Sequence, residues 1–190
     1  MIERAFLVVA VVIGGLIGIL VVAAVVLQIA GLLHTYRIPS SSMEPTLHCA
    51  RPGSECEAAH SDRVMAFDYV LGGPHRGDLV AFHTPSLALV RCGAGGTFLK
   101  RIVALPGERW EERSGVVYID GKPLAEPYIH QDRRDDRTIA PATVPHGEYV
   151  LLGDNRASSC DSRAWGTVPR KNLIGKVFAT YWPPGRITVR

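Results

Sequence analysis

The stretch TFLKRIVAL, residues 97–105, alternates between two sets of side chains, as a half-buried β-strand does. Phe98 and Lys100 fall on one face, and Leu99 and Arg101 on the other, because successive side chains of a strand point to opposite sides. A lysine on an apolar strand face is costly to keep charged, and burial there lowers the pKa of its ammonium group. The stretch alone leaves open a second interpretation, a lysine at a sheet edge that reaches into water.

Short apolar runs bounded by turn residues lie on both sides of this stretch and predict further strands. The predicted strands are Arg63–Tyr69, Asp78–His83, Ala88–Cys92, Thr97–Leu105, Gly115–Ile119, Glu148–Leu152 and Gly175–Trp182. Asp120-Gly121 predicts a hairpin turn, with Lys122–Leu124 on its far side. Residues 125–147, which include HQDRRDDR, are polar and irregular and predict a surface excursion. The soluble part is therefore expected to be mainly β, with antiparallel strands and no amphipathic helix.

A run without any charged residue extends from Ala5 to Leu33. It is longer than the about 20 residues that a helix needs to cross a bilayer. It is also longer than the apolar region of a cleavable signal peptide, and it lacks a clear small-x-small cleavage site. A buried core helix is excluded because apolar residues cover all faces. We therefore expect residues 1–36 to hold a short N-terminus and a membrane anchor, and residues 37–190 to form the β-rich domain.

The charged residues do not predict the orientation of the anchor, and they do not indicate a polyanionic partner. Arg4 lies before the apolar run and Arg37 after it, so the positive-inside rule gives almost no bias. The formal net charge of +3 is too small to indicate nucleic acid binding. The seven histidines show neither an HExxH motif nor ligand spacing, so no metal site is expected.

Four cysteines follow the apolar run. Cys49 and Cys56 enclose the short loop CARPGSEC, which a disulfide could close. Cys92 and Cys160 could pair if the sheet brings them together, and the alternative is two small buried thiols.

The serines of PSSSMEPT, residues 39–46, raise the question of nucleophilic catalysis. A serine hydroxyl is a poor nucleophile until a base removes its proton. No particular histidine is indicated as that base, and a neutral lysine can serve instead. Lys100 is the strongest candidate. The segment LLGDNRASSCDSRAWG, residues 151–166, combines turn residues with serines that could orient another side chain.

Six ordered motifs together resemble the type I signal peptidase family, the membrane-bound leader peptidases of bacteria. The motifs are PSSSMEPTL (39–47), DRVMAFDYV (62–70), RGDLVAF (76–82), FLKRIVALPGE (98–108), VYIDGKPL (117–124) and GDNRASSCDSRAWGTVP (153–169). The resemblance implies an antiparallel β-sheet catalytic domain with the signal-peptidase-like Ser/Lys fold, preceded by a single N-terminal transmembrane helix.

The resemblance also implies residue roles. Ser42 matches the nucleophile and Lys100 the general base. Ser40 matches the hydroxyl that joins the Ser42 backbone N–H in the oxyanion hole, and Ser159 matches the residue that orients the lysine. The residues that match supports of the site are Gly153, Asp154, Asp161 and Arg163. The residues that match positions near the shallow apolar substrate pockets are Ile38, Pro39, Met43, Leu47, Phe98 and Leu99.

The activity implied is removal of signal peptides from exported preproteins after a small-x-small site, through an acyl-enzyme and without a metal or cofactor. The implied partners are the signal peptides of preproteins, the lipid bilayer and the secretion translocon. The implied location is the bacterial plasma membrane, with a cytoplasmic N-terminus and the catalytic domain outside. Three alternatives stay open: a Ser/Lys processing peptidase of another system such as pilin or conjugation maturation, a self-cleaving repressor relative, and an inactive anchored β-domain.

Overall fold

The structure is a computed structural model that describes residues 2–70 and 72–190, with side chains from residue 10 onward. The chain divides into two compact units, residues 1–34 and residues 35–190. The sequence placed this division after residue 36, within the strand that joins the two units.

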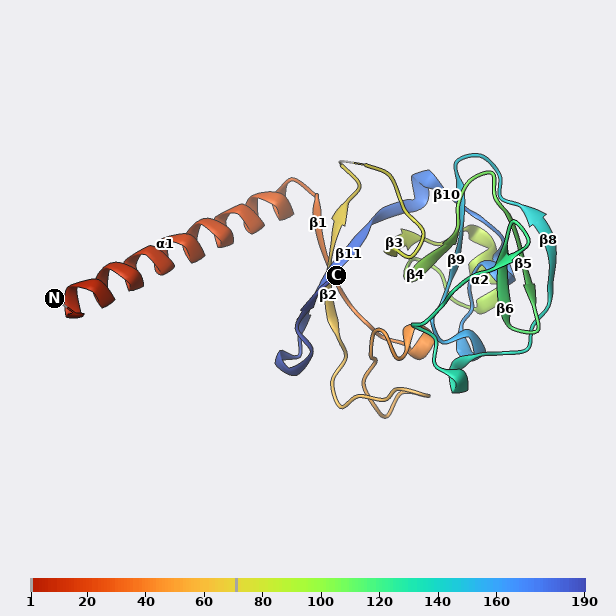
Figure 1. Cartoon of the computed structure of the whole chain (residues 1–190), viewed down its shortest axis with the longest axis horizontal. Coiled ribbons are helices and arrows are strands. Elements are labelled where there is room, and N and C mark those ends of the chain that lie inside the picture. Colours follow the sequence, from red (N-terminus) through yellow and green to blue (C-terminus); the bar gives the residue numbers. More distant parts are fainter. Residues whose placement is uncertain (1, 71) are drawn as a thin grey trace. The chain divides into compact units, whose positions relative to one another are not determined.

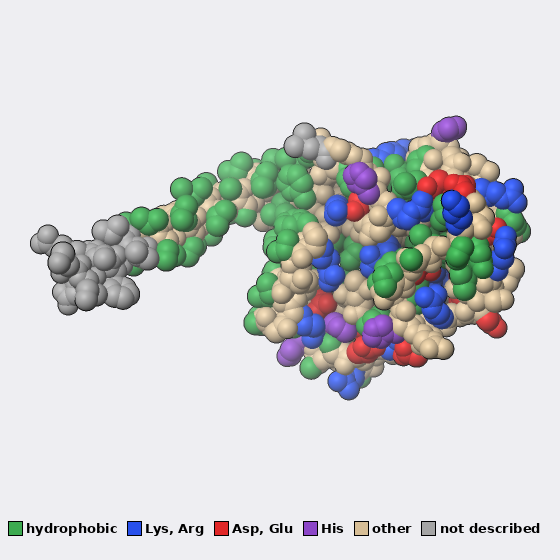
Figure 2. All heavy atoms as spheres, in the orientation of Figure 1, with side chains coloured by type: hydrophobic (Ala, Val, Ile, Leu, Met, Phe, Trp, Pro, Cys, Tyr) green, Lys and Arg blue, Asp and Glu red, His purple; other side chains and the backbone are tan. Residues whose placement is uncertain are grey.

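The first unit is essentially one helix, α1 (Ile2–Ile29). From Ala10 to Ile29 its mean hydropathy is 3.0, so it is long and apolar enough to cross a membrane. Ile19 and Leu20 are each 68% exposed. Figure 2 shows that hydrophobic side chains cover the described part of this helix. The first residues of the predicted apolar run lie outside the described side chains. The helix ends before Gly31, whose positive φ of 71° suits glycine.

The second unit is built on two antiparallel sheets, which confirms the predicted fold class. The larger sheet has eight strands in the order β1-β2-β11-β3-β4-β9-β10, with β12 paired to β11. The bounds of its strands are β1 Leu33–Arg37, β2 Arg63–Asp68, β3 Leu79–His83, β4 Thr97–Ala104, β9 Glu148–Leu152, β10 Val168–Pro169, β11 Leu173–Trp182 and β12 Thr188–Val189. Figure 1 shows β11, drawn in blue, running between β2 and β3.

The smaller sheet has four strands in the order β7-β6-β5-β8. Their bounds are β5 Arg109–Arg113, β6 Val116–Ile119, β7 Lys122–Pro123 and β8 Ile139–Thr143. The predicted hairpin at Asp120-Gly121 is confirmed, because β6 and β7 pair on either side of it. The short helices of the unit are α2 Ser86–Cys92, α3 Ser162–Trp165 and the 3-10 turns η1 Ser41–Met43, η2 Gln131–Arg133, η3 Arg156–Ser158, η4 Arg170–Asn172 and η5 Pro184–Arg186.

Two sequence predictions were wrong. The predicted strand at Ala88–Cys92 is helix α2, which begins after Pro85 and ends at Gly93 with a φ of 68°. A short apolar run has no periodicity that separates a strand from a buried helix turn. The predicted irregular excursion at 125–147 contains β8, which pairs with the unpredicted β5. Pro141 argues against a strand, and the structure tolerates it because β8 is an edge strand of its sheet.

The central position of β4 in the large sheet brings Lys100 into the protein interior. Lys100 pairs with Val80 of β3, and the next residue, Arg101, pairs with Leu152 of β9. Phe98 and Ile102 pack in one apolar cluster, whereas Leu99 packs against another. The alternation predicted for residues 97–105 is therefore present.

Candidate active site

The centre of the site is a contact between Ser42 and Lys100. Ser42 lies in the 3-10 turn η1, and Lys100 projects from the middle of β4. Lys100 Nζ donates a hydrogen bond to Ser42 Oγ at 2.6 Å. The lysine is 2% exposed, so it does not reach water as a surface lysine would. A hydroxyl held against a buried amine can transfer its proton to that amine when the amine is neutral.

Burial makes the neutral amine accessible near physiological pH. The pKa of Lys100 is lowered from 10.5 to about 8, mainly by desolvation and in part by the charge of Arg163, while the charges of Asp161 and Asp154 oppose the shift. The ring of Phe98 lies 5.8 Å from Nζ and supplies part of the apolar surroundings.

Because its pKa is lowered on folding, Lys100 lowers the stability of the domain. Between pH 8 and 10.5 the unfolded chain holds a proton that the folded chain has lost, so stability rises with pH across this window. We expect Lys100→Met to stabilise the fold at pH 7 by up to about 3 kcal/mol, because it removes a buried charge and keeps a similar volume. Thermal melts at pH 7 and pH 9.5 test this: the advantage of the variant should shrink at the higher pH. A melting temperature at pH 7 below that of the native chain would contradict it.

Ser40 lies beside the nucleophile candidate. Its Oγ is 3.3 Å from Ser42 Oγ, and its side chain is exposed. A hydroxyl in this position can donate to an oxygen that develops negative charge next to Ser42.

Asn155 connects the loop 153–161 to the turn that contains Ser42. The Asn155 backbone N–H donates to the Ser42 carbonyl at 3.2 Å, and Asn155 Nδ2 donates to the Ser41 carbonyl at 3.1 Å. Asn155 belongs to the GDNRASSCDSRAWGTVP motif, but no role was predicted for it from the sequence. The signal that it carried, Gly-Asp-Asn in a turn, predicts a loop and does not reveal the segment that the loop contacts.

Asp161 and Arg163 form a buried pair that shapes the loop. Asp161 accepts from the Gly153 N–H at 3.1 Å and from the Arg163 guanidinium at 2.8 Å through each of its oxygens. Burial alone would raise the pKa of Asp161, but the bonds and charge of Arg163 outweigh burial and lower it. The ionised carboxylate also caps α3 by accepting from the Arg163 N–H.

A second pair joins the loop to β4. Asp154 is completely buried, and the guanidinium of Arg101 donates to both of its oxygens, at 2.9 and 2.6 Å. Such a bidentate pair holds the two planar groups in one relative orientation. The third ion pair of the loop, Arg156 with Glu126, was missed in the sequence analysis. Arg156 is completely buried and donates to both oxygens of Glu126 and to the Gly153 carbonyl.

Ser159 does not make the hydrogen bond to Lys100 that the sequence analysis expected. Its Oγ is buried and has no hydrogen-bond partner among the residues that the structure describes. The hydroxyl lies close to Gly153, where an added Cβ would come within 2.2 Å of Ser159 Oγ and 2.5 Å of the Ser42 carbonyl. Gly153 therefore has to be glycine, since its Cα lies between Ser159 and the Ser42 carbonyl, where no side chain fits.

A cavity of about 510 Å³ opens beside Ser42 and Lys100. Five of the six predicted pocket residues line it, namely Ile38, Pro39, Met43, Phe98 and Leu99. Leu47 was wrongly expected there: it is completely buried in the core cluster that contains Val64 and Val177. Ala94 and Gly95 lie on the wall of the cavity, together with Cys92 and Cys160, and were not predicted.

Both candidate cysteine pairs are disulfides in the structure, Cys49–Cys56 and Cys92–Cys160. The alternative of two free thiols at Cys92 and Cys160 is therefore wrong for this structure. The second bridge links the end of α2 to the loop 153–161 at the cavity wall.

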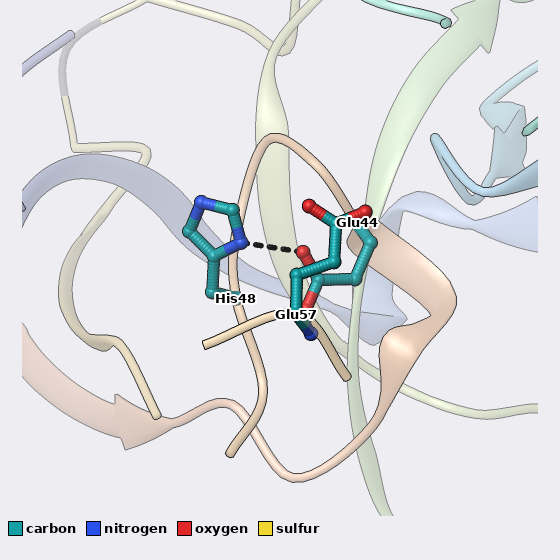
Figure 3. Close-up of side chains that lie close together, drawn as sticks. All are labelled: Glu44, His48 and Glu57. Carbon is teal, nitrogen blue, oxygen red and sulfur yellow. Dashed lines mark hydrogen bonds and ion pairs between the residues drawn. The ribbon is translucent and has the colours of Figure 1, made fainter. Parts of the chain in front are cut away.

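Glu44, His48 and Glu57 form a cluster that the sequence did not indicate (Figure 3). Their potential ligand atoms lie within 4.8 Å of one another. Each group already has protein partners: Glu44 accepts from His48 Nδ1 at 2.5 Å and from two backbone N–H groups, and Glu57 accepts from Arg133. We therefore assign the cluster a structural role.

Together, the fold and the site are those of one class of protein. An antiparallel β-domain that holds a serine hydroxyl against a buried lysine, beside an apolar cavity, has the layout of a serine peptidase with a Ser/Lys pair. Residues 10–182 match the family described as "Signal peptidase, peptidase S26". The chain belongs to this family.

Two curated relatives agree with this assignment. The chain is 40% identical over 152 residues to a protein of Synechocystis named "Probable signal peptidase I-2", an alignment that covers 79% of this chain and 63% of the relative. It is 38% identical over 153 residues to "Signal peptidase I" of Leptolyngbya laminosa, covering 79% and 69%. A crystal structure of a signal peptidase I from Enterococcus faecalis is 32% identical, with a TM-score of 0.44, and the match covers 56% of this chain and 97% of that one. The chain thus spans about two thirds of the length of the two curated relatives.

Proposed function

We propose that this protein is a serine endopeptidase that removes signal peptides from preproteins by cleaving after a small-x-small site. The observation that carries the proposal is the 2.6 Å contact between Ser42 Oγ and Lys100 Nζ, made in a chain of the signal peptidase family. The apolar cavity beside the pair has room for small side chains of an extended peptide.

In the proposed reaction, neutral Lys100 accepts the Ser42 proton as Oγ attacks the scissile carbonyl carbon. The carbonyl oxygen becomes negative, and the Ser40 hydroxyl and the Ser42 N–H donate to it. The Lys100 ammonium then gives its proton to the leaving amine, and the C–N bond breaks, which leaves an ester on Ser42. Neutral Lys100 next removes a proton from water, whose oxygen attacks the ester carbonyl carbon. The bond between this carbon and Ser42 Oγ then breaks, Lys100 returns its proton to Oγ, and the signal peptide leaves with a new carboxyl end.

We further propose that the loop 153–161, through Gly153, Asp154 and Asp161, holds this pair in place together with Arg163 of α3. Ser159 is proposed to orient Lys100 once substrate fills the cavity. The motivation is that its buried hydroxyl lacks a partner among the described residues, and a rotation about its Cα–Cβ bond re-aims it.

Family membership and the apolar helix support association with a membrane. We propose that α1 spans the bacterial plasma membrane once, with the N-terminus in the cytoplasm and residues 37–190 outside. A signal peptide is itself held in the bilayer, so tethering the enzyme in the same membrane raises the effective concentration of the two. The translocon is a further proposed partner.

We expect cleavage of a preprotein with an Ala-x-Ala site to rise with pH. With Lys100 as the base and its pKa at about 8, kcat/KM should increase about tenfold per pH unit below 8 and level off above it. The measurement is kcat/KM in detergent from pH 6 to 10, with mass spectrometry of the products and a Ser42→Ala control. A flat profile between pH 6 and 9, or cleavage at another position, would overturn the proposal.

A further inference from the structure

The disulfide Cys49–Cys56 closes a loop directly after the nucleophile turn. The base of this loop is held by Glu44, two residues after Ser42. One Glu44 oxygen accepts from the Cys49 N–H at 3.0 Å and from the Glu57 N–H at 3.2 Å, one on each side of the loop. The other oxygen contacts His48 (Figure 3). The disulfide and the buried carboxylate together fix the direction in which the loop leaves the core.

Glu55, the residue before the second cysteine of the bridge, has a φ of 58°. Residues other than glycine rarely adopt this left-handed backbone conformation, and those that do are often found at functional sites. Glu55 Oε2 accepts from Asn155 Nδ2 at 3.1 Å and lies 3.7 Å from Arg133 Nη1. Hydrogen bonds from Ser158 and Asn155 lower the pKa of Glu55, so the group is a carboxylate at neutral pH. The loop therefore presents an anion to the segment 155–158.

Asn155 connects Glu55 to the nucleophile turn, because it bonds both. Its Nδ2 group has two hydrogens, one directed to Glu55 and the other to the Ser41 carbonyl at 3.1 Å. Its backbone N–H bonds the Ser42 carbonyl at 3.2 Å. A carboxylate and a backbone carbonyl only accept hydrogen bonds, so Glu55 and the Ser41 carbonyl together hold the NH2 group of Asn155, and not its oxygen, toward them. Without Glu55 only the Ser41 carbonyl holds this orientation, and a rotated amide would place its oxygen against that carbonyl.

We propose that Glu55 is a positioning residue for the nucleophile, acting through Asn155 to hold the backbone at Ser41 and Ser42. This inference rests on the proposed peptidase function. It adds a role for the disulfide loop, which keeps Glu55 in reach of Asn155.

The test compares Glu55→Ala, Asn155→Ala and the double variant as full-length enzymes, with kcat and KM measured separately. We expect Glu55→Ala to lower kcat about tenfold, to change KM less than about twofold and to leave the melting temperature unchanged. Because the two residues act in series, the double variant should be no slower than Asn155→Ala alone. A purely structural role would instead change the melting temperature.

Glu57→Gln is the matched control, since Glu57 lies two residues along and also bonds Arg133, and we expect native kcat. An unchanged kcat in Glu55→Ala, or effects that multiply in the double variant, would overturn the inference. Loss of cleavage in Ser42→Ala tests the proposed function separately, so the failure of either proposal can be recognised.

Discussion

Replacing Ser42 by alanine, or Lys100 by methionine, is expected to lower cleavage of a preprotein by at least about 10⁴-fold. Alanine removes the oxygen that attacks the carbonyl carbon, and methionine removes the amine that accepts its proton. The two losses should not add in the double variant, because both residues serve the same step. The measurement is single-turnover cleavage with enzyme in excess over substrate.

Folding has to be separated from chemistry in this experiment. Ser42→Ala removes one oxygen, and Lys100→Met keeps a similar volume, so both should melt at or above the native temperature. Lys171→Met is the matched control, because this lysine is exposed and lies outside the cavity lining. Cleavage within tenfold of the native rate in either active-site variant would refute the proposed mechanism.

Arg156→Met is expected to destabilise the domain by about 3–5 kcal/mol, because it leaves a buried carboxylate without its cation. The side chains of Arg156 and Glu126 are 0% and 1% exposed, so water cannot replace the missing partner. For a domain of this size the loss corresponds to a fall in melting temperature of about 10 °C. Thermal and urea unfolding at pH 7 measure it.

The matched comparisons are a second variant and a surface pair. Arg156→Met combined with Glu126→Leu removes both charges and should recover most of the stability, since an apolar pair can replace a buried ion pair. Asp132→Asn removes the ion pair between Arg133 and a carboxylate that is 72% exposed, and should leave the melting temperature unchanged. A small effect of Arg156→Met alone would mean that the pair does not stabilise the loop.

Arg156→Met is also expected to lower activity, because Arg156 supports the loop that contacts the Ser42 turn. Arg156 Nε donates to the Gly153 carbonyl, and Gly153 passes within contact distance of the Ser42 carbonyl. We therefore expect kcat to fall in Arg156→Met even at temperatures where the domain is folded.

Much of the fold could be predicted from local pattern. The alternation in residues 97–105 places Lys100 and Phe98 together, and the turn Asp120-Gly121 marks the β6–β7 hairpin, because both depend only on neighbouring residues. The strand β8 was missed because Pro141 argues against a strand. The strand β5 was missed for a different physical reason. β5 reads RWEER, and its Glu112 is completely buried beside Arg163, a partner far away in the sequence. Burial raises the pKa of Glu112 to about 6, although Arg163 lowers it.

Some features of the candidate site could likewise be predicted from the sequence, and others could not. The residue types of the pair, a serine in a turn and a lysine on an apolar strand, can be read from sequence, and the family resemblance selects Ser42 among three adjacent serines. The position of Leu47 in the core, the helix at Ser86–Cys92 and the partners of Arg156 could not be predicted, because each depends on which distant segment packs against it.

By itself, the sequence determined an apolar helix long enough to span a membrane, a β-rich domain, and a serine and a lysine able to react. These properties follow from local composition and from the period-2 alternation of a strand. Only the tertiary structure decided that Lys100 is buried at 2.6 Å from Ser42, that Cys92 and Cys160 are bonded, and that Glu55 reaches Asn155. Those three contacts depend on sheet order and loop packing, which bring together residues that are 58, 68 and 100 positions apart in the chain.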